Sequence, residues 1–181
     1  MQISFQQATN SDTGLLVGFM RQFYEIDRYP FNEQIAFAAL EGILSDTTLG
    51  RVWIIAETGV PVGYIVLTFG YSLEYGGRDA FIDEFYIEAS QRGKGIGSQA
   101  IKFVEEACRE MGVQALHLEV ERGNKAGQGM YRYGSPQSLD KKSAQLRWNR
   151  SSLMAQVNRC RCLIAQALVQ PLLIVKPPIP A

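Results

Sequence analysis

Two neighbouring carboxylates, Asp83 and Glu84, are the side chains of this sequence best suited to accept a proton or to bind a cation. They lie in the segment 80–87, whose β-branched and aromatic residues predict a strand. Because neighbouring residues of a strand point to opposite faces, we expect Glu84 to share one face with Ile82 and Tyr86, away from Asp83. One acid would then face a reacting group. The alternative is a structural arrangement, with one acid exposed and the other in an ion pair.

A glycine-rich loop follows this strand, with the sequence Arg92-Gly93-Lys94-Gly95-Ile96-Gly97-Ser98. Glycines let the backbone pass close to a ligand, and the free N–H groups of a helix that begins at Ile96 suit a pyrophosphate. A dinucleotide-binding fingerprint would follow the first strand, whereas this loop follows the fourth, and the Gly-Lys-Ser/Thr of a Walker A loop is missing. The loop therefore predicts a phosphate-binding site, and a flexible surface turn is the alternative.

The spacing of apolar residues predicts the elements that position these groups. Gly112 is suited to end the helix that follows the loop. In chain order we expect strand 3–7, a helix from 12 through 23, helix 33–44, a hairpin of 52–57 and 64–69 with its turn at 59–63, strand 80–87, helix 96–111, strand 116–120 and a short helix at 126–133. This order predicts an α/β fold with a mixed, partly parallel sheet and helices on both faces.

The charges are divided unevenly along the 181 residues. Residues 1–134 hold 11 Lys and Arg against 17 Asp and Glu, a net charge of −6, and residues 135–181 hold 7 against Asp140, a net charge of +6. An acidic body favours a cationic small molecule over nucleic acid, although a merely solvated acidic surface is the alternative. We expect no membrane span, since the apolar stretch 163–175 is too short and contains Pro171.

The segment from Phe81 to Gly97 resembles the central motif of the GNAT acetyltransferases, of the form R/Q-x-x-G-x-G/A, and Asn124 to Tyr131 resembles the family's N-x-x-A-x-x-L-Y segment. The resemblance covers about residues 1–134 and implies that acetyl-CoA is a cosubstrate. It implies that the loop residues 92–98 hold the pyrophosphate of coenzyme A. It also implies that the main chain of Phe85, Tyr86 and Ile87 pairs with the pantetheine arm, and that Asn124 contacts that arm or caps a helix.

The resemblance also suggests catalytic roles. Related polyamine-type transferases carry a similar acidic pair, so we expect Asp83 to be a water-mediated base and Glu84 to bind or orient a cation. Tyr131 matches the family tyrosine that protonates the departing thiolate, with core packing as its alternative role. The implied reaction is acetyl transfer to a primary amine of a small cationic metabolite or peptide. The alternative is a catalytically impaired coenzyme-A-binding module with a structural or regulatory role.

The other candidate ligands give no metal site. His117 is the only histidine, and Cys160 and Cys162 have no partner pair of cysteines, so we expect no metal. Three cysteines do not make a disulfide framework, which favours a reducing, cytoplasmic setting. The basic tail has no aromatic residue besides Trp148 among its charges, which argues against nucleic-acid binding. A homodimer is common among proteins that resemble this one.

The resemblance ends at Gly134, which leaves an atypical basic tail at 135–181. This tail contains no Gly, Glu, Phe, Tyr, Thr or His, although the first 134 residues use all six. We therefore expect the family's two closing strands to be altered or missing, and we hypothesise a frameshifted or replaced C-terminus. A genuine extension, with a helix at 151–169, is the alternative. If another frame of the coding DNA encodes no Gly-Phe step and no alternating strands, the frameshift hypothesis is wrong.

Overall fold

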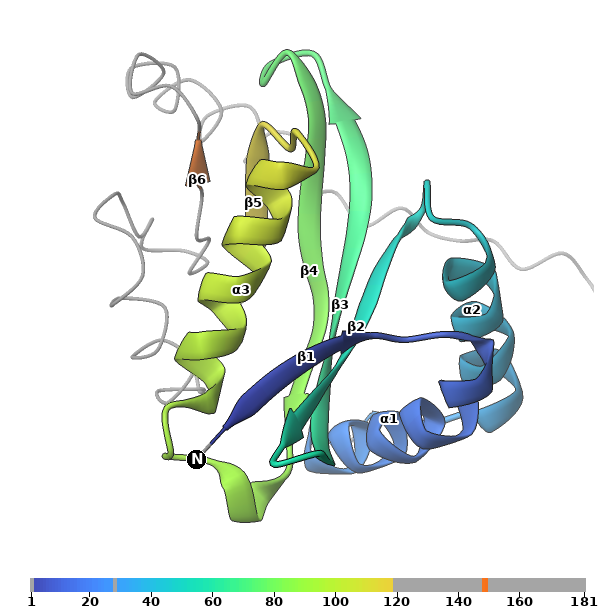
Figure 1. Ribbon diagram of the computed structural model, residues 1–181. Coiled ribbons are helices and arrows are strands. Elements are labelled where there is room, and N and C mark those ends of the chain that lie inside the picture. The colour runs from blue at the N-terminus through green and yellow to red at the C-terminus, as the bar shows by residue number, and fades with distance from the viewer. Residues whose placement is uncertain (1, 28, 119–147, 150–181) are drawn as a thin grey trace, which may run out of the picture. The chain divides into compact units, whose positions relative to one another are not determined.

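The computed structural model describes residues 2–27, 29–118 and 148–149, and its framework is one mixed sheet. The strands lie in the sheet in chain order (Figure 1). Neighbouring strands are antiparallel except β4 and β5, which are parallel, as expected for a strand–helix–strand crossover. The strands are β1 (Ile3–Gln7), β2 (Gly50–Glu57), β3 (Val60–Ser72), β4 (Gly77–Ile87), β5 (Ala115–Leu118) and β6 (Trp148–Asn149).

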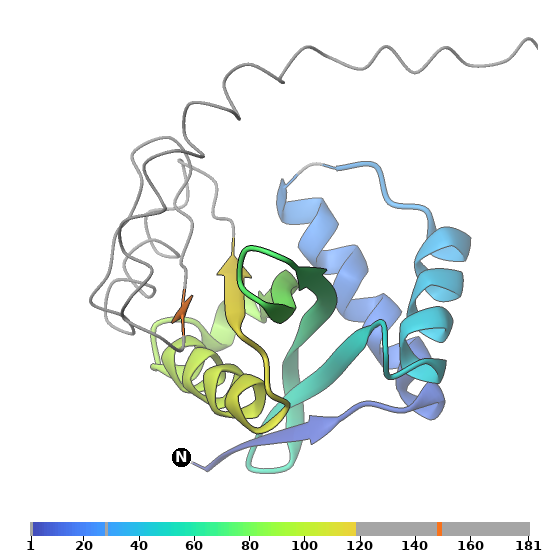
Figure 2. The same ribbon diagram turned by 90° about the horizontal axis from the view of Figure 1, so that it is seen from above.

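Helices cover both faces of this sheet, as the sequence predicts. Figure 2 shows α1 (Thr13–Asp27) and α2 (Glu33–Ser45) on one side of the sheet and α3 (Ile96–Glu110) on the other. Two short 3₁₀ helices, η1 (Asn10–Asp12) and η2 (Ala89–Gln91), precede α1 and α3. The α/β fold and the order of elements up to β5 are therefore confirmed.

A separate apolar cluster holds the helices on each face. On the first face, Leu16 and Phe19 of α1 pack with Val52, Tyr64 and Tyr86 of the sheet. On the second face, Ile101, Val104 and Cys108 of α3 pack against a different set of strand residues, which includes Ile65 and Ile82. A residue of β4 therefore lies on the side of the sheet whose apolar cluster it joins.

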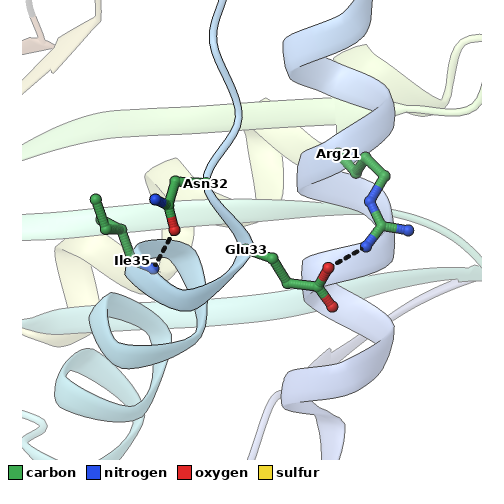
Figure 3. A network of polar contacts seen from close by, with 4 residues as sticks. All are labelled: Arg21, Asn32, Glu33 and Ile35. Carbon is green, nitrogen blue, oxygen red and sulfur yellow. Dashed lines mark hydrogen bonds and ion pairs between the residues drawn. The ribbon is translucent and has the colours of Figure 1, made fainter.

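Local hydrogen bonds fix where the first helices begin. The carboxylate of Asp12 accepts from the backbone N–H of Thr9, 2.8 Å away, at the start of η1. The side chain of Asn32 accepts from the N–H of Ile35 at 3.1 Å and so caps α2. Figure 3 shows this cap beside the ion pair between Arg21 of α1 and Glu33 of α2, which links the two helices.

The hairpin turn differs from its prediction. The sequence places the turn at 59–63, but the chain turns at Thr58 and Gly59, and β3 begins at Val60. Both turn residues have positive φ (51° and 82°), as a two-residue hairpin turn of the primed type requires. Pro61 lies inside β3, next to a register irregularity at Ile55/Ala56, and bulges tolerate a residue that lacks an N–H.

Of the C-terminal tail 135–181, the structure describes only residues 148–149. β6 pairs antiparallel with Ala115 and Leu116 of β5 over two residues, so this edge of the sheet is not left wholly unpaired. The strand predicted at 116–120 is seen through Leu118, and the helix predicted at 126–133 lies outside the described residues, as do most residues of the tail. No helix among the described residues is long and apolar enough to cross a membrane.

Candidate active site

The loop between β4 and α3 (residues 92–98) has an open, glycine-rich backbone, which we call the cradle. Gly93 and Gly95 have φ values of 77° and 80°, and a Cβ at either position would meet no atom within 4 Å. Gly95 is the N-cap of α3, so the N–H groups of the first turn of this helix have no partner inside it. The helix dipole adds positive potential at the same point. Backbone shape and charge therefore favour an anion here.

The loop cations lie on the surface around this cradle. Arg92 and Lys94 are exposed, and Ser98 is exposed on the first turn of α3. The Arg92 side chain donates from Nε to the carbonyl of Ile87 at 2.8 Å and lies over the Tyr86 ring. Lys94 donates to the side chain of Gln91. These contacts hold the cations near the end of β4, where their positive charge lies at the surface.

The last residues of β4 have a strand partner on only one side within the described part of the chain. The parallel pairing with β5 ends at Ile82 and Leu118, whereas the pairing with β3 continues to Ile87. Phe85, Tyr86 and Ile87 therefore keep one free edge there, where an extended ligand could add as a strand. This is the segment that the family resemblance assigns to the pantetheine arm.

A β-bulge corrects the predicted orientation of the two acids. Val66 pairs with Glu84 and Leu67 with Ile82, so Asp83 has no partner on β3. Ile82 packs on the α3 side, while Tyr86 packs on the α1 side. The prediction that Glu84 shares a face with Ile82 is therefore wrong. The extra residue brings both carboxylates to the side of α1 and α2.

Two tyrosines hold Glu84. The hydroxyl of Tyr24 donates to Oε1 at 3.0 Å and that of Tyr64 donates to Oε2 at 2.7 Å. Burial raises the pKa of Glu84, although the two phenol hydrogen bonds counteract it, and the nearby charge of Asp83 raises it further. Burial and the carboxylate of Glu84 also raise the pKa of Tyr24 to about 12, so this phenol keeps its proton.

Asp83 differs from Glu84 in its surroundings. Its side chain is exposed, and no hydrogen bond or ion pair joins it to another described residue. Its oxygens are therefore free to accept a proton from a ligand or from water. The bulge thus places a held carboxylate and a free carboxylate side by side.

Both acids line a cavity of about 600 Å³ between the sheet and the two N-terminal helices. Tyr24 of α1 and Val66 and Thr68 of β3 form part of its wall, and most of the remainder is apolar. The helix α2 contributes Ile35, Ala36, Ala39, Leu40 and Ile43. A concave, mainly apolar site with a few polar groups at one end is typical of small-molecule binding.

The sequence did not predict the two tyrosines or the cavity. Tyr24 and Tyr64 lie 60 and 20 residues from Glu84, and only the packing of α1 and the register of β3 bring their hydroxyls to it. Two other predicted site residues, Asn124 and Tyr131, lie outside the described residues.

His117 pairs with an acid of the neighbouring strand. Its Nε2 atom, on β5, lies 3.3 Å from Oδ2 of Asp79 on β4. Within the described ranges, no three His, Cys, Asp or Glu side chains gather as a metal site.

Comparisons with known proteins show the family to which this chain belongs. The chain belongs to the GNAT family of acetyltransferases, whose family model matches residues 17–134. It is 28% identical over 146 residues to a thialysine N-epsilon-acetyltransferase of Bos taurus, an alignment that covers 76% of this chain and 85% of the relative. The protein is therefore an acetyltransferase, and acetyl-CoA is the acetyl donor of its family.

Two solved structures show the same fold. An integron cassette protein from the mobile metagenome of Cole Harbour Salt Marsh matches with a TM-score of 0.66 and 38% identity, over 74% of this chain and 84% of that one. A predicted acetyltransferase from Clostridium acetobutylicum, crystallised with acetyl-CoA, matches with a TM-score of 0.64 and 18% identity. That alignment covers 84% of this chain and 97% of the other.

Proposed function

We propose that this protein transfers the acetyl group of acetyl-CoA to the primary amine of a small molecule held in the cavity beside Asp83 and Glu84. The observation that carries the proposal is the bulge at Asp83, which puts both carboxylates on the cavity wall just ahead of residues 85–87, whose β5 side has no partner among the described residues. The proposed site for acetyl-CoA, the acetyl donor, and the proposed site for the acceptor amine then lie next to each other along β4. The thialysine N-epsilon-acetyltransferase relatives support an amine as acceptor.

Acetyl-CoA is a substrate whose parts match groups of this chain. We assign its pyrophosphate to the open backbone of the loop, where Arg92, Lys94 and Ser98 surround Gly93, Gly95 and Gly97 and the buried Ile96 anchors α3. We assign its pantetheine arm to the free edge of Phe85, Tyr86 and Ile87, with Asn124 as a further contact. The positive φ of Gly93 and Gly95 and the absence of any atom near their missing Cβ groups support this fit.

In the proposed reaction, Glu84 attracts the acceptor while it is still an ammonium ion. Tyr24 and Tyr64 orient the two oxygens of Glu84, so the role of Glu84 is to hold a negative charge in a fixed position for the ammonium group. Asp83 accepts the ammonium proton through a water molecule, since its carboxylate is exposed and free. The neutral nitrogen attacks the thioester carbonyl, the carbon–sulfur bond breaks, and Tyr131 gives its proton to the departing thiolate. The nitrogen, which carries a positive charge after the attack, then loses its extra proton to the Tyr131 phenolate through water, which leaves the neutral amide and restores the phenol.

The roles of the two acids are tested by an Asp83→Asn variant. Without the base, turnover should fall by roughly 10²-fold or more. The affinity for acetyl-CoA, measured by calorimetry, should stay unchanged because Asp83 lies outside the loop. Glu41→Gln, which removes an exposed carboxylate of α2, is the matched control and should leave turnover unchanged. If Glu84→Gln lowers turnover more than Asp83→Asn, our order of the two acids is wrong.

A further inference from the structure

The charged side chains on the described cavity wall are two neighbouring acids. Among the described residues that line it, Asp83 and Glu84 are the only acids, and no Lys, Arg or His lines it. Besides them, the polar side chains in the described wall are those of Tyr24, Asn32 and Thr68. The described wall thus offers a counter-charge to one ammonium group beside the bulge, and none to a carboxylate or to a second, distant cation.

Most of the remaining wall is apolar, and part of it is built from small side chains. The helix α2 presents Ala36, Ala38, Ala39 and Gly42 to the cavity, which makes room beneath the helix. A charged group placed there would lose its hydration without gaining a partner, which is strongly unfavourable. An apolar group placed there would instead be favoured, because it removes apolar surface from water.

The size of the cavity leads to the same conclusion. A volume of about 600 Å³ lies within the range of sites that enclose drug-sized ligands. An acceptor that held only an amine and a short polar chain would leave much of the apolar wall against water. The cavity therefore fits an acceptor with a substantial apolar part.

We propose that the acceptor is a primary amine with a single positive charge, carried on an apolar aliphatic or aromatic body that lies beneath α2. This inference rests on the proposed function and narrows its substrate class. The ammonium group meets the two carboxylates, and the apolar body lies against the small residues of α2. Polyamines and free amino acids are then poor acceptors, because each carries an additional charge into the apolar part of the cavity.

A series of straight-chain alkylamines tests this directly, because their nitrogens have nearly equal basicity. From propylamine to hexylamine, kcat/KM should rise about fourfold for each added methylene, the gain expected from burying one CH₂ group. Hexane-1,6-diamine is the matched comparison for hexylamine, since it has the same length and a second cation. Its kcat/KM should be lower by on the order of 10-fold or more.

Two variants of α2 test whether the apolar body of the acceptor lies beneath this helix. Ala39→Leu fills part of the cavity and should lower kcat/KM for hexylamine more than for propylamine, with the KM for acetyl-CoA unchanged. Glu41→Leu adds the same side chain at an exposed position of the same helix that does not line the cavity, and it should alter neither. Equal effects of the two variants on hexylamine would overturn the placement of the apolar body.

The outcomes separate this inference from the proposed function. Release of coenzyme A with spermidine, lysine or hexane-1,6-diamine at rates equal to or above those with hexylamine overturns the inference and leaves the amine acetyltransferase intact. A kcat/KM that does not rise with chain length also overturns it. No release with any amine overturns the proposed function, and this inference with it.

Discussion

Glu84 carries its charge in a partly buried position, and this makes the stability of the protein depend on pH. Burial raises the pKa of Glu84 above its ordinary value of 4.5. A carboxyl whose pKa is higher in the folded state contributes stability that is fully present below the unfolded pKa and is lost as the pH rises through the folded pKa. The ionised form of Glu84 therefore lowers the free energy of unfolding near neutral pH.

A Glu84→Gln variant tests this sign, because glutamine has nearly the same shape and no charge. Relative to wild type, its free energy of unfolding should increase as the pH is raised from about 4 to about 7. Denaturant titrations at several pH values measure the difference. Glu41→Gln, at an exposed site of α2, should show no such trend. A Glu84→Gln advantage that shrinks with rising pH would mean that the phenol hydrogen bonds outweigh burial.

At this scale, the sequence located the two acids but not their surroundings. The types and positions of Asp83 and Glu84 are visible in a single strand segment. The partners of Glu84 are not, because Tyr24 belongs to a helix and Tyr64 to another strand, and their hydroxyls reach Glu84 only after the helix packs. Long-range side-chain contacts of this kind leave no periodic signal along the chain.

At the scale of elements, apolar periodicity predicted the strands and helices up to β5 but missed the bulge in β4. Regular alternation assigns Asp83 and Glu84 to opposite faces, and the extra residue in β4 brings both to the same face. The bulge depends on how β3 pairs with β4, which the residues of β4 alone do not specify. The same limit explains the misplaced hairpin turn, where a second irregularity shifts the register of β2 and β3.

The loop at the start of α3 offers a prediction with an internal control. Gly95 and Gly112 flank this helix, both have positive φ, and a Cβ at either position would meet nothing within 4 Å. Alanine should therefore cost each end a similar amount of stability, about 1–2 kcal/mol. Only Gly95→Ala should weaken acetyl-CoA binding, on the order of 10- to 100-fold, the loss expected for one hydrogen bond to a charged group.

Calorimetry on both variants, with thermal unfolding to confirm matched stability, makes this comparison. Gly112→Ala should bind acetyl-CoA as wild type does, because it lies at the opposite end of α3. Equal losses of affinity for acetyl-CoA in Gly95→Ala and Gly112→Ala would mean that the loss comes from a general weakening of α3 and not from the loop. Unchanged affinity in folded Gly95→Ala would contradict the assignment of the loop to the pyrophosphate.

At the scale of the whole molecule, β4 joins the two halves of the proposed site. Along this strand, the carboxylates at 83 and 84 come first, then residues 85–87, which have no partner on the β5 side within the described part of the chain, then the glycine-rich loop. The family model matches residues 17–134, which include all of these groups. Tyr131, the proposed proton donor, lies in the same matched range but outside the described residues.

The most direct test of the account measures acetyl transfer and acetyl-CoA binding on the same full-length protein. Coenzyme A release and N-acetylated product are quantified with hexylamine, phenethylamine, spermidine and lysine, and binding is measured by calorimetry. We predict equal amounts of coenzyme A and acetylated amine with at least one of these acceptors. Tyr131→Phe should lower turnover by roughly 10²-fold or more and keep binding. Tight binding of acetyl-CoA without coenzyme A release for any amine would contradict the account and identify a coenzyme-A-binding module.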